Sequence, residues 1–263
     1  MTNNIQSKHI KVGSLNIRYF AGGQGEPLVI IHGGGDGARA WLQNAEELSQ
    51  HYSVYIPDLP GFGRSQSAND KFNLPEFVAF IEGFSQALGL EPFYLMGHSI
   101  GGGIALHYAL SFPQKVKGLV LVSSWCLGIE AALWVRLLSR PAFCNSLGEA
   151  SIAIVKAVKW LARIFYAPFK FANPPTRLKM EMGKTMMTLK GQNTVLLNQL
   201  SELTVPTMLV WGAGDRIVPA THAYAAAELI PNCRLHVFER CGHSVYKDRT
   251  KELSQLLAKF LDN

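Results

Sequence analysis

The 263-residue chain has few cysteines, few charged residues and no apolar run near the roughly 18 residues that a membrane span needs. Charged residues make up only 17%, against about 25% in an average globular protein. The four cysteines, Cys126, Cys144, Cys233 and Cys241, share no metal-ligand spacing and are too few for a disulfide scaffold. Residues 1–14 are polar and lack the apolar segment of a secretory signal, so we expect a cytoplasmic protein with reduced thiols.

Hydrophobic residues, by contrast, make up 48% of the chain, which is enough to bury a large core and excludes general disorder. The 24 glycines and 13 prolines follow no period, which excludes collagen-like and coiled-coil architectures. The length fits one large α/β domain that carries an insertion.

The net charge of +6 is concentrated between Trp125 and Leu200, where ten Lys and Arg residues stand against three Glu residues. The rest of the chain has 15 basic and 16 acidic residues, a net charge of −1. A basic excess is compatible with nucleic-acid binding, but no recognition motif accompanies it. We therefore expect no nucleic-acid partner.

Short apolar runs alternate with helix-length segments along most of the chain. Apolar runs without polar alternation fit strands covered on both faces, and strands alternating with helices imply right-handed parallel crossovers. The sequence therefore predicts a doubly wound, mostly parallel α/β sheet. A hairpin is expected over residues 10–20, strands over 28–31, 52–56, 93–96, 118–122, 207–211 and 234–238, and helices over 38–49, 74–88, 100–110, 221–229 and 247–261.

The alternation stops after Val122, and no strand pattern returns before Thr207. Helical patterning rich in Leu, Trp, Phe and Met fills the gap, with prolines at 168, 174 and 175 that would divide it into separate helices. We expect a core formed by residues 1–124 and 201–263, and a helical cap, or lid, formed by residues 125–200.

The strongest chemical signal is the G-x-S-x-G pattern of residues 97–101, which places Ser99 between an expected strand and an expected helix. Flanking glycines permit the sharp turn that lifts a serine hydroxyl to the carboxyl edge of a parallel sheet. Ser99 is therefore the candidate nucleophile.

A serine hydroxyl reacts only when a base removes its proton, and that base needs an orienting acid. Asp215 follows the expected strand 207–211, and His243 follows the last expected strand. The order Ser, Asp, His along the chain matches a nucleophile-elbow hydrolase. Three other histidines lie within expected helices or strands, and we interpret them as structural: His107, His222 and His236.

A glycine run, His32-Gly33-Gly34-Gly35, follows the first expected parallel strand. Acyl transfer requires two backbone N–H donors aimed at the developing oxyanion. We assign these donors to Gly34 and Ile100. A phosphate-binding loop is the alternative, but neither G-x-G-x-x-G nor the lysine of a P-loop is present.

The chain resembles the α/β-hydrolase superfamily over nearly its whole length. Besides the serine motif, the segment from Asp58 to Ser65 (D-L-P-G-F-G-R-S) is similar to the family's loop after the fourth strand, and Trp211-Gly-x-x-Asp215 is similar to its acid loop. The resemblance implies an eight-stranded sheet and a catalytic triad of Ser99, His243 and Asp215 beneath a lid. It implies no metal and no organic cofactor.

The serine nucleophile argues against the haloalkane dehalogenases and epoxide hydrolases of this superfamily, which carry aspartate at that position. The triple glycine with Trp41 resembles the carbon–carbon hydrolases of meta-cleavage pathways. Those enzymes show Asn before the nucleophile and Trp after the catalytic histidine, where this chain has His98 and Ser244. We therefore favour hydrolysis of a small-molecule carboxylic ester, acylglycerols and other lipophilic esters included. Carbon–carbon cleavage, perhydrolase activity and amide substrates stay open.

Five residues are candidates for lining the substrate pocket: Gly33, Gly35, His98, Trp125 and Trp160. In the expected lid, Lys156, Lys159 and Arg163 share one stripe of a helix whose other positions are apolar. The simplest interpretation is a solvated outer face. A peripheral contact with an anionic membrane and attraction of an anionic substrate are the alternatives.

A non-catalytic ligand-binding protein of the same fold is the alternative from another functional class, since fold does not fix function. A pure binding protein has no need of Ser, Asp and His at three separate strand ends. The sequence gives no indication of the oligomeric state.

Overall fold

The computed structural model describes residues 5–35, 37–67, 73–132, 136, 186–188 and 190–261. Most of the expected lid lies outside these described residues, including Trp160 and the basic stripe of Lys156, Lys159 and Arg163. The domain boundaries and the helical content expected for residues 125–200 therefore stay predictions.

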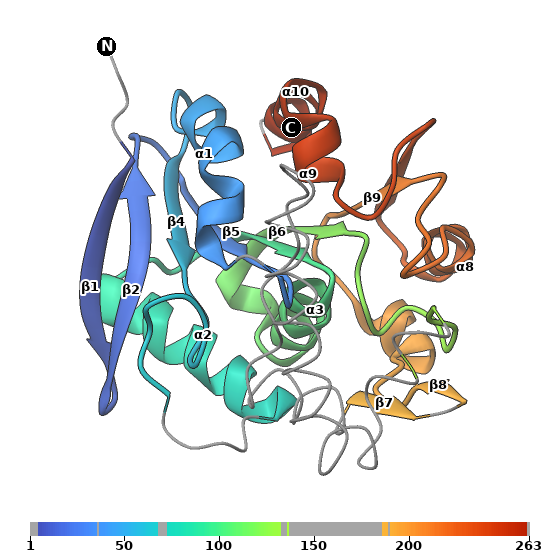
Figure 1. Cartoon of the computed structure of the whole chain (residues 1–263), viewed down its shortest axis with the longest axis horizontal. Coiled ribbons are helices and arrows are strands. Elements are labelled where there is room, and N and C mark those ends of the chain that lie inside the picture. The colour runs from blue at the N-terminus through green and yellow to red at the C-terminus, as the bar shows by residue number, and fades with distance from the viewer. Residues whose placement is uncertain are drawn as a thin grey trace, which may run out of the picture.

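One eight-stranded sheet forms the centre of the molecule, with the strand order β1-β2-β4-β3-β5-β6-β9-β10 (Figure 1). The β1–β2 hairpin is antiparallel and joins β4 antiparallel, whereas the pairs from β4 to β10 are parallel. The expected hairpin and the mostly parallel, doubly wound sheet are confirmed. The strands are β1 Gln6–Val12, β2 Leu15–Gly22, β3 Pro27–Ile31, β4 Ser53–Pro57, β5 Phe93–His98, β6 Val116–Val122, β9 Thr207–Gly212 and β10 Cys233–Phe238.

Both faces of the sheet are buried, which explains the apolar runs without alternation. In β3, Leu28 and Ile30 pack in the cluster on one face, while Val29 and Ile31 pack in the cluster on the other. Because successive strand residues point to opposite faces, a strand covered on both sides must be apolar at every position.

Helices cover the two faces separately. Buried residues of α2, α3 and α8 belong to one core cluster, and those of α1, α9 and α10 belong to the other. In Figure 1, α1 and α10 lie above the sheet and α2 and α3 lie below it.

None of the helices among the described residues is long and apolar enough to cross a membrane. The helices are η1 Ala38–Trp41, α1 Leu42–Leu48, α2 Leu74–Leu88, α3 Ile100–Ser111, η2 Pro113–Lys115, η3 Leu197–Glu202, α8 Thr221–Leu229, α9 Val245–Asp248 and α10 Thr250–Leu261.

Local signals in the sequence set several helix ends. Helix α2 begins with a capping box, in which the Asn73 side chain accepts from the Glu76 amide and the Glu76 carboxylate accepts from the Asn73 amide. It ends at Gly89, which adopts the left-handed conformation typical of a helix C-terminus. The expected bounds of α2 and α8 agree with the structure.

Two expected helices differ from the observed elements, and one small hairpin was not expected. The expected helix over 38–49 is a 3₁₀ turn followed by α1, and the expected helix over 247–261 is divided into α9 and α10. The second break occurs at Arg249, whose φ of −134° is not helical. A small hairpin, β7 Met187–Thr188 and β8 Gly191–Gln192, also lies where no strand was expected before Thr207. Its strands have two residues each, too few to produce a periodic pattern.

The two ends of the insertion lie side by side where they join the sheet. The Leu196 amide donates to the Cys126 carbonyl over 2.8 Å, and the Gln192 side chain accepts from the Cys126 amide over 2.8 Å. These bonds close the base of the segment that leaves β6 at Val122 and returns to β9 at Thr207.

A buried ion pair joins β2 to the loop after β4. The guanidinium of Arg18 contacts the Asp58 carboxylate, with Nε 2.6 Å from Oδ2, and the two side chains are 5% and 0% exposed. Asp58 also accepts from the amides of Ala38 and Arg64. One carboxylate therefore positions two segments: the start of η1, which follows the glycine run, and the loop Asp58–Ser65.

We expect Asp58→Asn to lower the free energy of unfolding by about 3–5 kcal/mol, because the substitution leaves the Arg18 guanidinium buried without its counter-charge. Equilibrium urea unfolding measures the change. The matched control is Glu26→Gln, which breaks the ion pair with Lys117. That pair has side chains 53% and 32% exposed, so the control should cost less than about 1 kcal/mol. Equal losses in the two variants would show that burial does not decide the contribution of these pairs.

Candidate active site

Ser99 lies at the sharp turn between β5 and α3. Its φ of 55° and ψ of −122° lie outside the regions that non-glycine residues ordinarily adopt. The turn is tight: a Cβ at Gly97 would lie 2.2 Å from the Gly101 carbonyl oxygen, so neither end of the turn admits a larger residue easily. The structure thus has the strand–turn–helix arrangement that the G-x-S-x-G pattern predicts.

Asp215 and His243, from the loops after β9 and β10, are in direct contact. The Nδ1 atom of His243 lies 2.8 Å from Oδ2 of Asp215. The second carboxylate oxygen, Oδ1, accepts from the amides of Ile217 and Val218 over 2.8 and 3.0 Å. Because a carboxylate only accepts, Nδ1 of His243 carries the proton, and Nε2 is the nitrogen left to act as a base.

The Asp215 carboxyl group is buried yet ionised. Burial by itself would raise its pKa, but the hydrogen bond and charge of His243 and the two loop amides outweigh burial and hold the pKa below its usual value. Asp215 is therefore an acceptor for the imidazole N–H throughout the neutral pH range.

The glycine run approaches the serine turn closely. A Cβ placed on Gly33 would lie 3.1 Å from Cβ of Ser99, and one placed on Gly34 would lie 3.2 Å from Cδ1 of Ile100. The two residues assigned to the oxyanion hole, Gly34 and Ile100, are thus neighbours. Ile100 is also the first residue of α3, where backbone N–H groups lack helical acceptors and favour negative charge.

His32 holds the glycine run in place. Its Nε2 accepts from the Leu59 amide over 3.0 Å, so the neutral ring carries its proton on Nδ1, which donates to the Gly33 carbonyl over 2.7 Å. The imidazole therefore connects the loop after β3 to the loop after β4. In the sequence His32 is marked only as the start of the glycine run, because both of its partners depend on how the loops fold.

His98, a candidate pocket residue, is buried beneath the site. Its Nε2 lies 3.0 Å from the His243 carbonyl oxygen, and its ring is surrounded by Trp41, Tyr246 and His243. Burial and the neighbouring His243 lower the pKa of His98 to about 3. His98 is therefore a neutral imidazole that contacts the loop bearing His243.

The remaining pocket candidates fall into different environments. Trp125 is buried, and its amide donates to the Ser99 carbonyl over 3.0 Å, so it lies directly behind the serine turn. Gly35 is exposed at the tip of the glycine loop. Trp160 lies outside the described residues. Their contact with a substrate stays a prediction.

The insertion is connected to the acid loop. Nε2 of His222 lies 2.7 Å from Oε2 of Glu130, and the Ala132 amide donates to the Ile217 carbonyl over 3.1 Å. A backbone hydrogen bond at Glu130 itself, together with the bond to His222, holds the pKa of the Glu130 carboxyl below its usual value. His222 thus has the structural role expected for it, and the insertion begins against the loop that carries Asp215.

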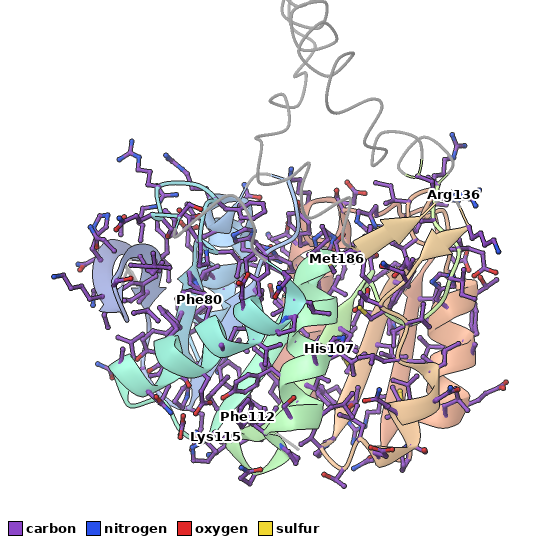
Figure 2. All side chains as sticks on the ribbon, turned by 90° about the horizontal axis from the view of Figure 1, so that it is seen from below. Phe80, His107, Phe112, Lys115, Arg136 and Met186 are labelled. Carbon is purple, nitrogen blue, oxygen red and sulfur yellow. The ribbon has the colours of Figure 1, made fainter. Side chains whose placement is uncertain are left out.

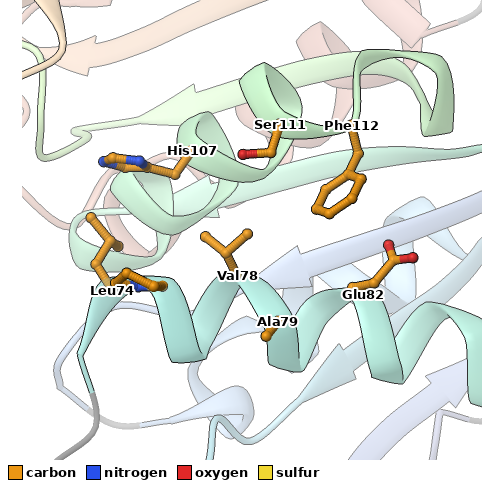
Figure 3. A pocket seen from close by; sticks show the side chains of 8 residues that line it. Leu74, Val78, Ala79, Glu82, His107, Ser111 and Phe112 are labelled. Carbon is orange, nitrogen blue, oxygen red and sulfur yellow. The ribbon is translucent and has the colours of Figure 1, made fainter.

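A cavity of about 440 Å³ lies elsewhere, between α2 and α3. Leu74 and Val78 on one helix face His107 and Ser111 on the other (Figure 3). Figure 2 shows His107 and Phe112 well along α3, away from its first turn. None of the lining residues belongs to the Ser99, Asp215 or His243 loops, so the cavity is not part of this site.

Metal ligands are not clustered in the part of the chain that the structure describes: no group of three or more His, Cys, Asp or Glu side chains could hold an ion. The described cysteines Cys126, Cys233 and Cys241 are free thiols. Burial raises the pKa of Cys126 to about 12, so this thiol beside the serine turn stays protonated and unreactive.

Comparison with known proteins supports the assignment of the fold. The structure of a serine hydrolase from the polyaromatic hydrocarbon-degrading bacterium Cycloclasticus zankles superposes with a TM-score of 0.80, at 23% identity and 98% coverage of both chains. A membrane phospholipase A superposes with a TM-score of 0.74, at 23% identity, and covers 98% of this chain and 86% of that one.

The sequence comparisons identify the family. The 2-hydroxy-6-oxo-6-phenylhexa-2,4-dienoate hydrolase of Burkholderia cepacia is 27% identical over 261 residues, which cover 92% of this chain and 89% of that protein. A family model described as the alpha/beta hydrolase fold matches residues 26–193 and 186–250. Since this match spans well over half of the sequence, the chain belongs to the α/β-hydrolase fold family.

Proposed function

We propose that the protein is a serine hydrolase that cleaves carboxylic esters through an acyl-enzyme intermediate. The observation that carries the proposal is the contact of His243 with a buried, ionised Asp215. The main chain of His243 also bonds His98, the residue that precedes Ser99 in its strained turn. A binding protein of this fold has no use for such an ordered acid–histidine pair.

The proposed mechanism has two acyl-transfer halves. His243 takes the proton of Ser99 as the hydroxyl attacks the ester carbonyl, and the N–H groups of Gly34 and Ile100 stabilise the oxyanion. A donor of this kind contributes about 3 kcal/mol of transition-state stabilisation. His243 then protonates the leaving alcohol, and the same imidazole activates the water that releases the acid. Asp215 holds the required tautomer and stabilises the imidazolium.

Carbon–carbon hydrolysis is the second candidate, because the Burkholderia cepacia relative carries the name of a 2-hydroxy-6-oxo-dienoate hydrolase. Two features favour esters. The residue before the nucleophile is His98, where the meta-cleavage enzymes show Asn, and its Nε2 is engaged with the His243 carbonyl. The residue after His243 is Ser244, where those enzymes show Trp. The fold that this chain shares with a phospholipase A is compatible with ester substrates.

We also propose that residues 125–200 cover the site as a lid and select the substrate. The first residues of this segment contact the serine turn through Trp125 and the acid loop through Ala132. The basic excess of the segment supports the further hypothesis of a peripheral contact with anionic lipid.

Ser99→Ala should abolish hydrolysis of short p-nitrophenyl esters while the thermal unfolding midpoint stays close to that of the wild type, because only the hydroxyl is removed. A fluorophosphonate probe should label the wild type at Ser99 and leave the variant unlabelled. Undiminished turnover by the variant would exclude Ser99 as the nucleophile.

Asp215→Asn should lower kcat for the same esters by about 10⁴-fold, because an amide in this position favours the wrong tautomer of His243. The asparagine keeps Oδ1 for the Ile217 and Val218 amides, so the loop should retain its conformation. The matched control is Asp248→Asn, an exposed aspartate of α9, which should leave kcat unchanged. Equal kcat values for the two variants would remove Asp215 from the mechanism.

A substrate panel separates the two candidate reactions. We expect p-nitrophenyl esters of graded acyl length to be hydrolysed with a higher kcat/KM than 2-hydroxy-6-oxo-6-phenylhexa-2,4-dienoate. Cleavage of the dienoate is measured by the decrease of its absorbance. The reverse order would favour carbon–carbon cleavage.

A vesicle experiment tests the lipid contact. The long-acyl esters are assayed with and without anionic phosphatidylglycerol vesicles at low salt, and the protein is sedimented with the same vesicles. A protein that does not sediment with them would exclude the lipid contact.

A further inference from the structure

His98 lies in a cage of aromatic rings. Its ring centroid is 4.8 Å from that of Tyr246, 4.8 Å from that of His243 and 6.1 Å from that of Trp41. Trp41 and Tyr246 also stack on each other at 4.6 Å. The imidazole is 5% exposed, so its orientation is fixed by packing.

The hydrogen bond of His98 fixes its protonation. A carbonyl oxygen only accepts, so Nε2 of His98 must carry a proton and donate it to the His243 carbonyl over 3.0 Å. The other nitrogen, Nδ1, faces Gly33, where a Cβ would lie 2.8 Å away. The titratable groups around the ring are those of His243, His32 and Asp215, and the Tyr246 ring packs against it in a T-shaped contact. Burial and His243 oppose a second proton, so the ring is the neutral Nε2–H tautomer.

This bond connects two parts of the site that the sheet holds apart. His98 is the last residue of β5 and precedes Ser99, while His243 follows β10. In the sheet, β6 and β9 lie between β5 and β10. Two further bonds, from the Gly214 amide to the Cys241 carbonyl and between His243 and Asp215, join the histidine loop to the acid loop.

We propose that His98 is a positioning residue: by donating Nε2–H to the main chain of His243, it sets the distance between the imidazole of His243 and the hydroxyl of Ser99. The inference rests on the proposed function of these two residues. It holds for ester and carbon–carbon substrates alike, because both reactions require the same activated serine.

Two substitutions separate the hydrogen bond from the volume of the side chain. His98→Leu removes the donor, whereas His98→Gln places an amide N–H the same number of bonds from Cα as Nε2 of histidine. With p-nitrophenyl butyrate and with a fluorophosphonate probe, we expect His98→Leu to lower kcat and the labelling rate by about 10²-fold, the effect of a misplacement near 1 Å. KM should change by less than about twofold, since the proposal has the buried His98 act through His243 and not by binding substrate.

His98→Gln should recover most of the lost kcat and labelling rate. The control His236→Leu removes a partly buried histidine from β10, outside the site, and should leave both unchanged. Labelling of His98→Leu at the wild-type rate would overturn the inference. So would a His98→Gln variant that folds with the wild-type unfolding midpoint and stays as slow as His98→Leu. A wild type that the probe does not label would instead refute the proposed function itself.

If His98→Leu does not fold, the protonation state of His98 in the wild type tests the inference. In ¹⁵N-histidine spectra, the His98 signals are those that disappear in His98→Gln. We expect a protonated Nε2, an unprotonated Nδ1 and no titration between about pH 5 and pH 8, the range in which an ordinary histidine changes charge. A proton on Nδ1, or titration in this range, would overturn the inference.

Discussion

The close approach of the serine turn to the neighbouring backbone is the constraint on which the rest of the site depends. Gly97 and Gly101 face each other across the turn, and a Cβ at Gly101 would lie 2.4 Å from the carbonyl oxygens of Ile31 and His32. Helix α3 therefore begins directly against the end of β3. That contact brings the glycine run within reach of Ser99 and Ile100, and no larger residue could take these positions without moving the strands.

Around this turn, buried polar side chains form hydrogen bonds to loops that lie outside the strands. Asp58 joins Arg18 of β2 to the amides of Ala38 and Arg64, and His32 joins the glycine run to Leu59. In each case one side chain satisfies groups from two or three separate segments. Such groups are costly to bury without partners, so each network specifies one arrangement of the loops.

The base of the insertion contacts the loops of this site. Its first residues contact the serine turn through the amide of Trp125, the acid loop through Ala132 and helix α8 through Glu130, and its last residues return beside Cys126. These bonds join the base of the insertion to the serine turn and to the loop that carries Asp215, so the proposed lid and the proposed catalytic residues are directly connected.

The sequence alone determined the layer architecture and the mostly parallel, doubly wound sheet, and it predicted Ser99, Asp215 and His243 as residues that follow three of its strands. Apolar runs identify two-sided strands, and the carboxyl ends of parallel strands meet at one edge, so residues that follow those strands converge whatever their separation along the chain. Only the tertiary structure decided the partners of His98, Arg18, Asp58 and Glu130, because each bond joins segments that no local pattern relates. The small hairpin β7–β8 and the break at Arg249 were missed because their own residues carry no periodic signal. Gln192 of the hairpin bonds Cys126 and Ile129, and the Arg249 side chain bonds the Glu239 carbonyl.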